Sequence, residues 1–356
     1  MNICFICSNF WPHTYGGTER FLYELAKELI RAGYEVTYIS YNWGASEIPL
    51  ESIGEPSPLY DEKGRRRISA QIQFGIKSAR KAKELKCDVY NITVPYTPTF
   101  FLPREKTVLM LFELWGKKWL EYYPPPLSHA VMTAEKILVK WPEKVITASN
   151  IVAEKVRKYR KNVKVIKLGL RLEEYLPYRS SAKTYDIAYI GRLVPYKGLY
   201  ETLQVLKKLK KKSRIAIIGD GPLYTQISSF LSVYPHEVHM FRKVSEEEKR
   251  KILAQSKVYI NTSRSEGFSI STLEAIMLGA YPVVYSAGGY NVATEIVNTL
   301  SYGKVFNTLE ELPVILEEIL LKDNVESLDP AKLQEYDIKR TAEEYIKVYK
   351  ELYVSF

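Results

Sequence analysis

The sequence has 356 residues, 46% hydrophobic and 26% charged, an ordinary globular composition that excludes a disordered or fibrous chain. This length is about twice the usual size of one domain, so it predicts two domains. The net charge is +10, and residues 1–168 carry +9 of it, which favours an anionic partner for the first half. A solvated basic face that keeps the protein soluble is the alternative.

Membrane-spanning and disulfide-rich classes are also disfavoured. No apolar run reaches the roughly 18 residues that are needed to cross a bilayer. The start at Met1 has no basic stretch of the kind that opens a secretory signal. Three cysteines cannot form a disulfide framework, which predicts a reducing, cytoplasmic compartment.

Short apolar runs alternate with amphipathic stretches along the first half, which is typical of an α/β domain. The first strand is expected at 3–8, and a helix over 18–31 ends at Gly33. The proline-containing stretch 46–67 is expected to be a loop. The other strands predicted in this half are 35–40, 89–93, 108–112, 145–148 and 163–167.

A second series of strands and helices follows, with strands expected at 186–190, 214–219, 258–261 and 282–285. A polar segment without periodicity, 177–184, predicts a linker near this point. We therefore expect a first domain over 1–170, a second over 171–335 and a final helix within 336–356. Two doubly wound domains in tandem predict a ligand crevice at the carboxyl ends of their strands.

The strongest local motif is the segment Ser263–Ala275, which joins a strand to a helix. Glu266 lies in the loop and Glu274 in the first turns of the helix, while Gly267 permits a sharp bend. Two carboxylates so placed can accept hydrogen bonds from separate hydroxyls of one extended ligand, and the first helical amides are expected to be unpaired. Alternatively, Ser271 and Glu274 form a capping box.

Two glycine-containing loops follow other strands of the second half. In Gly191–Gly198, Arg192 and Lys197 flank a turn and suit a diphosphate, although exposed loop cations are often only solvated. The second loop, Gly219–Pro222, lets the backbone approach a ligand closely or is an ordinary turn.

In the first half, Gly16 and Gly17 precede a helix and form another anion-accepting corner. The loop is not a Gly-x-Gly-x-x-Gly motif, and no acidic residue ends the next strand, so a nicotinamide or flavin dinucleotide is disfavoured. His13 in the same loop is a candidate substrate contact or an incidental loop histidine.

These motifs, in this order along most of the chain, resemble the retaining glycosyltransferases of family 4, which have the two-domain GT-B fold. The resemblance implies a sugar-nucleotide donor, UDP- or GDP-linked, bound mainly by the second domain and an acceptor bound mainly by the first. It also implies that the final helix crosses back onto the first domain. The expected acceptor is a glycan or a lipid-linked molecule.

The resemblance also implies roles for individual residues. Arg192 and Lys197 would hold the diphosphate, and Glu274 the ribose hydroxyls. Glu266 would contact the sugar, helped by the segment 267–270. The base would lie near Val244. The donor-binding residues so predicted are Gly16, Gly17, Arg192, Lys197, Gly221, Val244, Gly267, Phe268, Ser269, Ile270 and Glu274, with Glu266, Arg192 and Lys197 also catalytic.

Charge considerations predict a reaction without a metal or other cofactor. Arg192, Lys197 and helix-terminal amides can stabilise the negative charge on the leaving diphosphate. No Asp-x-Asp element ends a strand, and Cys4 and Cys7 lie within one strand with too few partners for zinc. The acceptor hydroxyl is expected to attack on the leaving-group face, which retains the anomeric configuration, while Glu266 orients the sugar.

The acceptor side departs from the family. The family commonly has histidine followed by an acid at the end of a first-domain strand, whereas this chain has Phe112 and Glu113, so Glu113 is a possible substitute. Aromatic and basic residues interleave over 115–124, and more cations lie over 77–86. Together they suit an anionic membrane surface, or else a solvated basic helix beside a half-buried aromatic loop. No nucleic-acid-binding module is recognisable.

Two other functions remain open at this level. A GT-B-fold epimerase of sugar nucleotides would release free UDP without an acceptor. A nucleotide-sugar-binding protein without transferase activity would bind a donor but show no turnover. The two cations and two carboxylates of the second half argue against an inactive protein, while the missing first-domain histidine keeps that alternative open. An epimerase would normally need acid/base carboxylates and histidines in the crevice.

Overall fold

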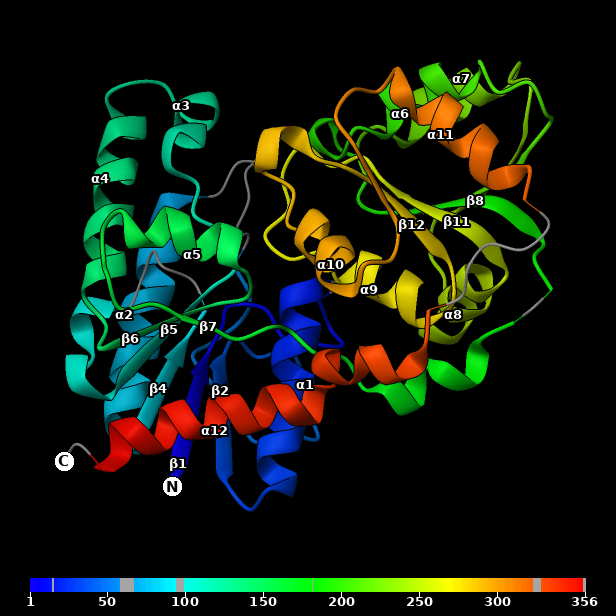
Figure 1. Ribbon diagram of the computed structural model, residues 1–356. Coiled ribbons are helices and arrows are strands. Elements are labelled where there is room, and N and C mark those ends of the chain that lie inside the picture. Colours follow the sequence, from blue (N-terminus) through cyan, green and yellow to red (C-terminus); the bar gives the residue numbers. More distant parts are fainter. Residues whose placement is uncertain (15, 58–66, 94–98, 181, 323–327, 355–356) are drawn as a thin grey trace. The chain divides into compact units, whose positions relative to one another are not determined.

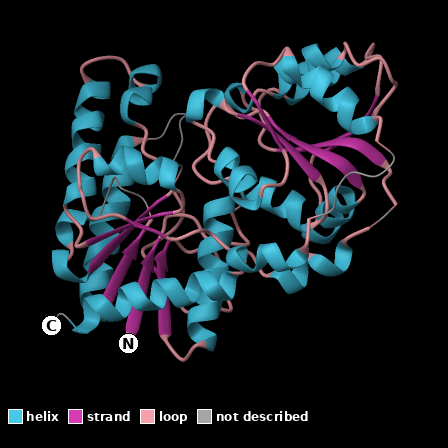
Figure 2. Cartoon of the chain, in the orientation of Figure 1, coloured by secondary structure: helices cyan, strands magenta, loops and turns pink. Residues whose placement is uncertain are grey.

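The computed structural model describes residues 1–356 except 15, 58–66, 94–98, 181, 323–327 and 355–356. The chain divides into two compact units: the first unit comprises 1–170 with 335–356, and the second comprises 171–334. Each contains a parallel sheet with helices packed on it (Figures 1 and 2). The predicted α/β fold class is confirmed.

The sheet of the first unit has strand order β3-β2-β1-β4-β5-β6-β7, and all of its neighbouring strands pair in parallel. The central strands are mostly apolar because both faces of a parallel sheet are covered. Residues 3–6 of β1 are at most 1% exposed. The strands are β1 (Asn2–Ile6), β2 (Glu35–Ser40), β3 (Leu50–Ser52), β4 (Val89–Ile92), β5 (Thr107–Leu111), β6 (Lys144–Thr147) and β7 (Lys164–Val165). The helices are α1 (Gly17–Arg31), α2 (Ile68–Leu85), α3 (Trp119–Tyr122), α4 (Leu127–Lys140), α5 (Asn150–Arg157) and α12 (Ile338–Val354).

Two features of the first unit differ from expectation. Strand β3 lies inside the stretch 46–67 that was expected to be a loop, of which 58–66 lie outside the described residues. Cys4 and Cys87 form a disulfide with their Cα atoms 6.0 Å apart, because pairing of β1 with β4 brings these distant residues together. Only Cys7 is a free, buried thiol. The cysteine count therefore gives no argument for a reducing compartment.

The second unit has the strand order β10-β9-β8-β11-β12-β13, again parallel throughout. Its strands are β8 (Tyr185–Ile190), β9 (Arg214–Ile218), β10 (Glu237–Phe241), β11 (Ser256–Asn261), β12 (Tyr281–Tyr285) and β13 (Lys304–Phe306). Its helices are α6 (Leu199–Leu206), α7 (Tyr224–Leu231), α8 (Glu246–Ala254), α9 (Ile270–Met277), α10 (Ala293–Leu300) and α11 (Glu311–Leu320). The sequence analysis missed β10 and β13, which are the two edge strands and carry polar residues on exposed positions.

The boundary between the units lies at Leu170, earlier in the chain than the linker expected at 177–184. Arg179 instead belongs to the second unit, where its guanidinium donates to the carbonyls of Met277 (2.9 Å) and Ile276 (3.4 Å). These carbonyls end α9, and a cation at a helix C-terminus is stabilising. The predicted linker segment is therefore part of the scaffold beneath α9.

The chain returns to the first unit at Glu335, and α12 packs against α1 there (Figure 1). The rings of Phe21 and Tyr345 lie 6.3 Å apart at this contact. Leu170 forms a parallel bridge with Asp337 beside it. Among the described residues, no helix combines the length and the apolar composition that crossing a bilayer requires.

Candidate functional site

The candidate site lies where the strand order of the second unit reverses, between β8 and β11. The chain runs outward from β8 to β10 on one side and from β11 to β13 on the other. The two neighbouring strands pair at Tyr189 and Ile260, so the loops that follow them leave the sheet side by side. Such a switch point is where open parallel sheets bind ligands.

Backbone contacts fasten the loop after β8 to the loop after β11. The amide of Arg264 donates to the carbonyl of Tyr196 (2.9 Å), and the hydroxyl of Thr262 donates to the carbonyl of Lys197 (3.2 Å). Gly198 has a φ of +72°, and a Cβ on it would lie 2.5 Å from the Thr262 carbonyl oxygen. Only glycine satisfies both the turn and this close approach.

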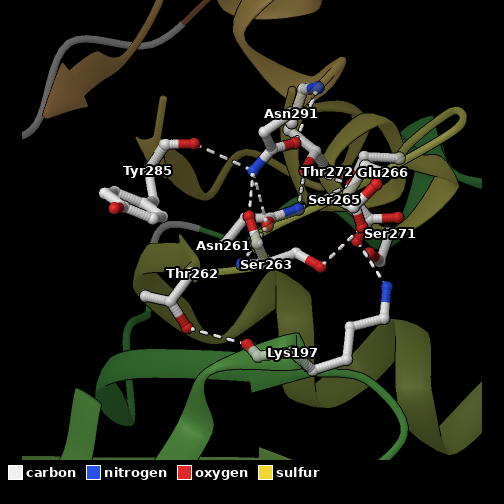
Figure 3. A network of polar contacts seen from close by, with 12 residues as sticks. Lys197, Asn261, Thr262, Ser263, Ser265, Glu266, Ser271, Thr272, Tyr285 and Asn291 are labelled. Carbon is white, nitrogen blue, oxygen red and sulfur yellow. Dashed lines mark hydrogen bonds and ion pairs between the residues drawn. The ribbon is translucent and has the colours of Figure 1, made fainter. Parts of the chain in front are cut away.

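This arrangement brings Lys197 and Glu266 together, as their placement in two strand-end loops predicted. The Nζ of Lys197 lies 2.5 Å from Oε1 of Glu266, and Figure 3 shows the two side chains pointing toward each other. Their side chains are only 18% and 12% exposed, so solvent screens the pair weakly. Arg192 differs: its side chain is exposed and has no ion-pair partner among the residues that the structure describes.

Two buried asparagines hold the loop that carries Glu266 (Figure 3), and the sequence analysis did not find them. Asn291 is fully buried, and the two hydrogens of its Nδ2 are shared among three acceptors: the side-chain oxygen of Asn261 (3.1 Å) and the carbonyls of Ser263 (3.2 Å) and Tyr285 (2.9 Å). Asn261 in turn donates to the hydroxyls of Ser269 (2.8 Å) and Thr272 (3.1 Å). The network thus ties β11, β12 and the start of α9 to one loop.

The same network reaches the backbone of Glu266. Glu266 forms a parallel bridge with Asn291, and its amide lies 3.3 Å from the Tyr290 carbonyl that it donates to. A buried, satisfied polar network specifies a unique conformation. The backbone that carries the Glu266 side chain is therefore held in place. The adjacent Gly267 is half-buried.

Glu274 is buried at 2% exposure within α9. It accepts hydrogen bonds from the hydroxyl of Tyr175 (3.0 Å) and from Nζ of Lys249 (2.9 Å). The capping-box alternative is wrong, because α9 begins at Ile270 and Ser271 instead accepts a hydrogen bond from the hydroxyl of Tyr259 (2.8 Å).

The expected unpaired amides at the start of α9 are present only in part. The amide of Ile270 donates to the carbonyl of Phe268 (3.2 Å), so it already has a partner. Ser269 is 1% exposed, and its hydroxyl lies 2.7 Å from that of Thr272. Phe268 is half-buried. The turn before α9 therefore already pairs the Ile270 amide, one of the backbone donors that were expected to be available to a ligand.

The loop after β9 closes against the loop after β8. Leu193 donates from its amide to the Asp220 carbonyl (2.9 Å), and a Cβ on Gly221, whose φ is +155°, would lie 2.6 Å from the Leu193 carbonyl oxygen. The carboxylate of Asp220 accepts from Arg242 (3.0 Å), and this pairing lowers its pKa. Val244 is half-buried in the loop after β10.

The candidate residues of the first unit have local partners. Gly16 adopts an extended conformation before α1, and a Cβ on it would collide with the carboxylate of Glu19. The exposed His13 has its Nε2 3.0 Å from the carbonyl oxygen of Ala45. Glu113 forms an ion pair with Lys118 at 2.9 Å. Gly17 is the first residue of α1.

Two buried tyrosines lie on the central strands beneath the site. Burial raises the pKa of Tyr259, and the carboxylates of Glu266 and Glu274 raise it further. Burial likewise raises the pKa of Tyr189, with added contributions from Tyr259 and Glu266. Both phenols therefore remain protonated at neutral pH and can donate hydrogen bonds.

Two protein-family models match adjacent parts of the chain. The model described as Glycosyltransferase Family 4 matches residues 15–174, and the model described as Glycosyl transferases group 1 matches residues 177–301. The first ends shortly after the first unit does, and the second covers the strand-end loops of the site.

Individual relatives point the same way. The O-antigen chain mannosyltransferase C of Escherichia coli is 21% identical over 293 residues, which is 77% of this chain and 76% of that protein. The GDP-mannose:cellobiosyl-diphosphopolyprenol alpha-mannosyltransferase of Xanthomonas oryzae pv. oryzae is 30% identical over 129 residues, 34% of each chain.

Among solved structures, Anabaena HepE in complex with UDP and glucose superposes with a TM-score of 0.72. It is 17% identical and covers 99% of this chain and 100% of its own, so the likeness shows the fold. The motifs, the two parallel-sheet units and these similarities agree. The chain belongs to the family 4 glycosyltransferases, and it is a glycosyltransferase with the GT-B fold.

Proposed function

We propose that the enzyme transfers a sugar from a nucleotide-diphosphate-sugar donor to a glycan or lipid-linked acceptor, with retention at the anomeric carbon and without a metal ion. The observation that carries this proposal is the Lys197–Glu266 pair, held at the switch point of the second unit. A cation and a carboxylate in contact there match the two ends of such a donor, since the diphosphate is anionic and the sugar carries hydroxyls.

In this proposal Arg192 and Lys197 bind the diphosphate, and Glu266 accepts hydrogen bonds from the sugar hydroxyls. Arg192 is suited because it is exposed, whereas Lys197 exchanges Glu266 for phosphate oxygens. Glu274 is assigned to the ribose, and Lys249 and Tyr175 orient its carboxylate. The backbone at Gly221 and the side chain of Val244 would border the nucleotide.

The proposed chemistry keeps its charges balanced. The bond between the anomeric carbon and the phosphate oxygen breaks, and its electron pair leaves with the diphosphate. The acceptor hydroxyl attacks the anomeric carbon from the same face, and its proton passes to a phosphate oxygen of the leaving group. Fixed cations aimed at the oxygen where charge develops stabilise this step, which is the task assigned to Arg192 and Lys197.

The acceptor is proposed to be lipid-linked and the enzyme to work at an anionic membrane surface on the cytoplasmic side. The Xanthomonas relative has a diphosphopolyprenol acceptor in its name, which supports a lipid-linked substrate. The aromatic segment over 115–123 contributes less than its composition suggested, because Trp119 and Tyr123 are at most 7% exposed and stack on each other. Lys118 is engaged with Glu113.

A better candidate for the membrane-facing surface lies on α2 and the adjoining turn over Thr99–Phe101, which contact each other. Four large apolar side chains here are 43–50% exposed: Ile72, Ile76, Phe100 and Phe101. The exposed cations Lys77, Arg80 and Lys83 follow on the same helix. Apolar side chains flanked by cations fit an anionic bilayer surface.

Vesicle binding tests the membrane part of the proposal. The wild-type enzyme is expected to sediment with vesicles containing phosphatidylglycerol and to remain free with phosphatidylcholine alone. Exchanging Phe100 and Phe101 for serine should abolish sedimentation. Leu321→Ser in the second unit is the matched control, because Leu321 is 79% exposed and lies in neither α2 nor its turn. Equal sedimentation of the wild type with both vesicles would remove this part of the proposal.

A thermal-shift panel of UDP-, GDP- and dTDP-sugars tests the donor. One base is expected to raise the unfolding temperature, and the matching sugar nucleotide should then be consumed in the presence of EDTA. Product NMR of the anomeric centre reports retention or inversion. Loss of turnover with EDTA that only Mn²⁺ restores would contradict the metal-free step, and no stabilisation by any member would contradict donor binding.

A further inference from the structure

Tyr189 on β8 reaches the carboxyl edge of the sheet with its hydroxyl. The residue is 2% exposed, and its ring packs in the core of the second unit. A Cβ built on Gly191 would lie 2.8 Å from the Tyr189 hydroxyl oxygen. The side chain therefore runs along its own strand toward the loop that begins at Gly191, and that position must lack a side chain to leave room.

The Tyr189 hydroxyl has no hydrogen-bond partner within the described part of the chain. A buried hydroxyl in this state costs free energy, and phenylalanine would fill the same space without that cost. Its neighbour Tyr259, on the adjacent strand β11, shows the ordinary solution, because its hydroxyl donates to Ser271 at 2.8 Å. The unpaired hydroxyl of Tyr189 is therefore available to a hydrogen-bond acceptor on a bound ligand.

The surroundings of this hydroxyl show what kind of partner fits. Tyr189 lines one recess together with Lys197, Glu266 and Ser263, where Asn261 and Ile190 complete the wall. Lys197 is paired with Glu266 in this narrow recess, and once the ligand displaces Glu266 the ammonium favours an anionic oxygen, to which a protonated phenol can donate one hydrogen bond. The other unpartnered tyrosine hydroxyls among the described residues, those of Tyr38, Tyr345 and Tyr349, all lie in the core of the first unit.

We propose that Tyr189 is a further donor-binding residue, whose hydroxyl donates a hydrogen bond to a non-bridging phosphate oxygen of the bound nucleoside diphosphate beside Lys197. This inference rests on the proposed function, since it presumes a nucleotide-diphosphate-sugar donor. The hydroxyl would supply a directional hydrogen bond in addition to the positive charge of Lys197. Because Tyr189 lies on a core strand, movement of the neighbouring loops would not displace it.

The experiment is the removal of one oxygen atom by Tyr189→Phe in the full-length enzyme. UDP and GDP are titrated calorimetrically into the wild type and the variant, and unfolding temperatures are measured without nucleotide. We expect the dissociation constant of the preferred nucleotide to rise about tenfold, as for a lost hydrogen bond to a charged group. The unfolding temperature should stay equal or rise, because no intramolecular hydrogen bond is lost.

Tyr349→Phe is the matched control, because it also deletes a buried unpartnered hydroxyl but in the first unit. It should leave nucleotide affinity unchanged. Unchanged affinity in Tyr189→Phe, or a lowered unfolding temperature, would overturn the assignment of Tyr189 while leaving the proposed function intact. Failure of the wild type to bind either nucleotide would overturn the proposed function and this inference with it.

Discussion

The strand-end loops of the two units are built differently. In the second unit, Asn261 and Asn291 are buried and fasten the loop of Glu266 to two strands and a helix. In the first unit, His13 is exposed and lies against a backbone carbonyl, and Glu113 pairs with Lys118, whose side chain is 30% exposed. A preorganised polar site loses little conformational entropy when a ligand binds, whereas a loosely held site must be ordered by its ligand. The proposed donor site of the second unit is therefore more preorganised than the proposed acceptor residues of the first.

The largest effect should follow Lys197→Ala. Removing the cation leaves Glu266 buried without its partner and removes charge stabilisation from the leaving diphosphate. We expect kcat to fall by roughly 10²–10³-fold, as for the loss of one group aimed at developing charge. Turnover of the matched sugar nucleotide measures it.

Lys118→Ala is the corresponding change in the first unit, at the more exposed pair with Glu113. It should alter kcat by less than about threefold, because half-exposed ion pairs contribute little. Equal losses in the two variants would break the comparison between the units.

Asn291→Ala probes the buried network directly. The change removes the two Nδ2 hydrogens that are shared among three acceptors, and the oxygen that accepts from the amide of Ala293. We expect the free energy of unfolding of the second unit to fall by about 2–4 kcal/mol. Urea denaturation, followed by far-ultraviolet circular dichroism, measures this change.

The exposed Asn307, which contacts Ser286, gives the control. Asn307→Ala should cost less than about 1 kcal/mol, because its partners regain water. A loss as small for Asn291→Ala would mean that the network does not hold the loop.

Glu274→Gln separates binding from turnover. The amide keeps the shape but loses the charge that faces Lys249. We expect the dissociation constant of the nucleotide to rise roughly tenfold while kcat changes less, because the proposed contact of Glu274 is to the ribose, away from the bond that breaks. Calorimetry and steady-state kinetics give the two quantities. A fall in kcat with unchanged affinity would reassign Glu274 to the chemical step.

A smaller, pH-dependent effect is expected from Lys183, which donates to the carbonyls of Ala254 (2.7 Å) and Gly279 (3.2 Å). Burial, together with the positive charge of Arg179, lowers its pKa from 10.5 to about 8. At pH values between these two pKa values, the lysine is more protonated in the unfolded chain than in the folded chain. The free energy of unfolding therefore rises with pH in this interval.

Lys183→Met removes that contribution. The wild type should therefore gain stability relative to the variant between pH 7.5 and 9.5, as measured by urea denaturation at each pH. A constant difference across this interval would show that Lys183 titrates alike in the folded and unfolded chain.

The sequence predicted the central strands and the Lys197–Glu266 loops well, because both depend on local patterns: apolar runs, and polar residues directly after them. It could not predict the role of Asn291, since asparagine is common in turns and its partner Asn261 is 30 residues away. The pairing of Cys4 with Cys87 was hidden for the same reason, being created by strand pairing. Edge strands β10 and β13 lack the apolar run that identifies a central strand.

Gly198 has a consequence that reaches beyond its own turn. Its bare Cα is what allows the backbone of one loop to rest against the Thr262 carbonyl of the other. Any larger residue would wedge these loops apart and lengthen the gap between the ammonium of Lys197 and the carboxylate of Glu266. The absence of one methyl group thus sets the spacing of two opposite charges, and with it the strength of the ion pair that a ligand must displace.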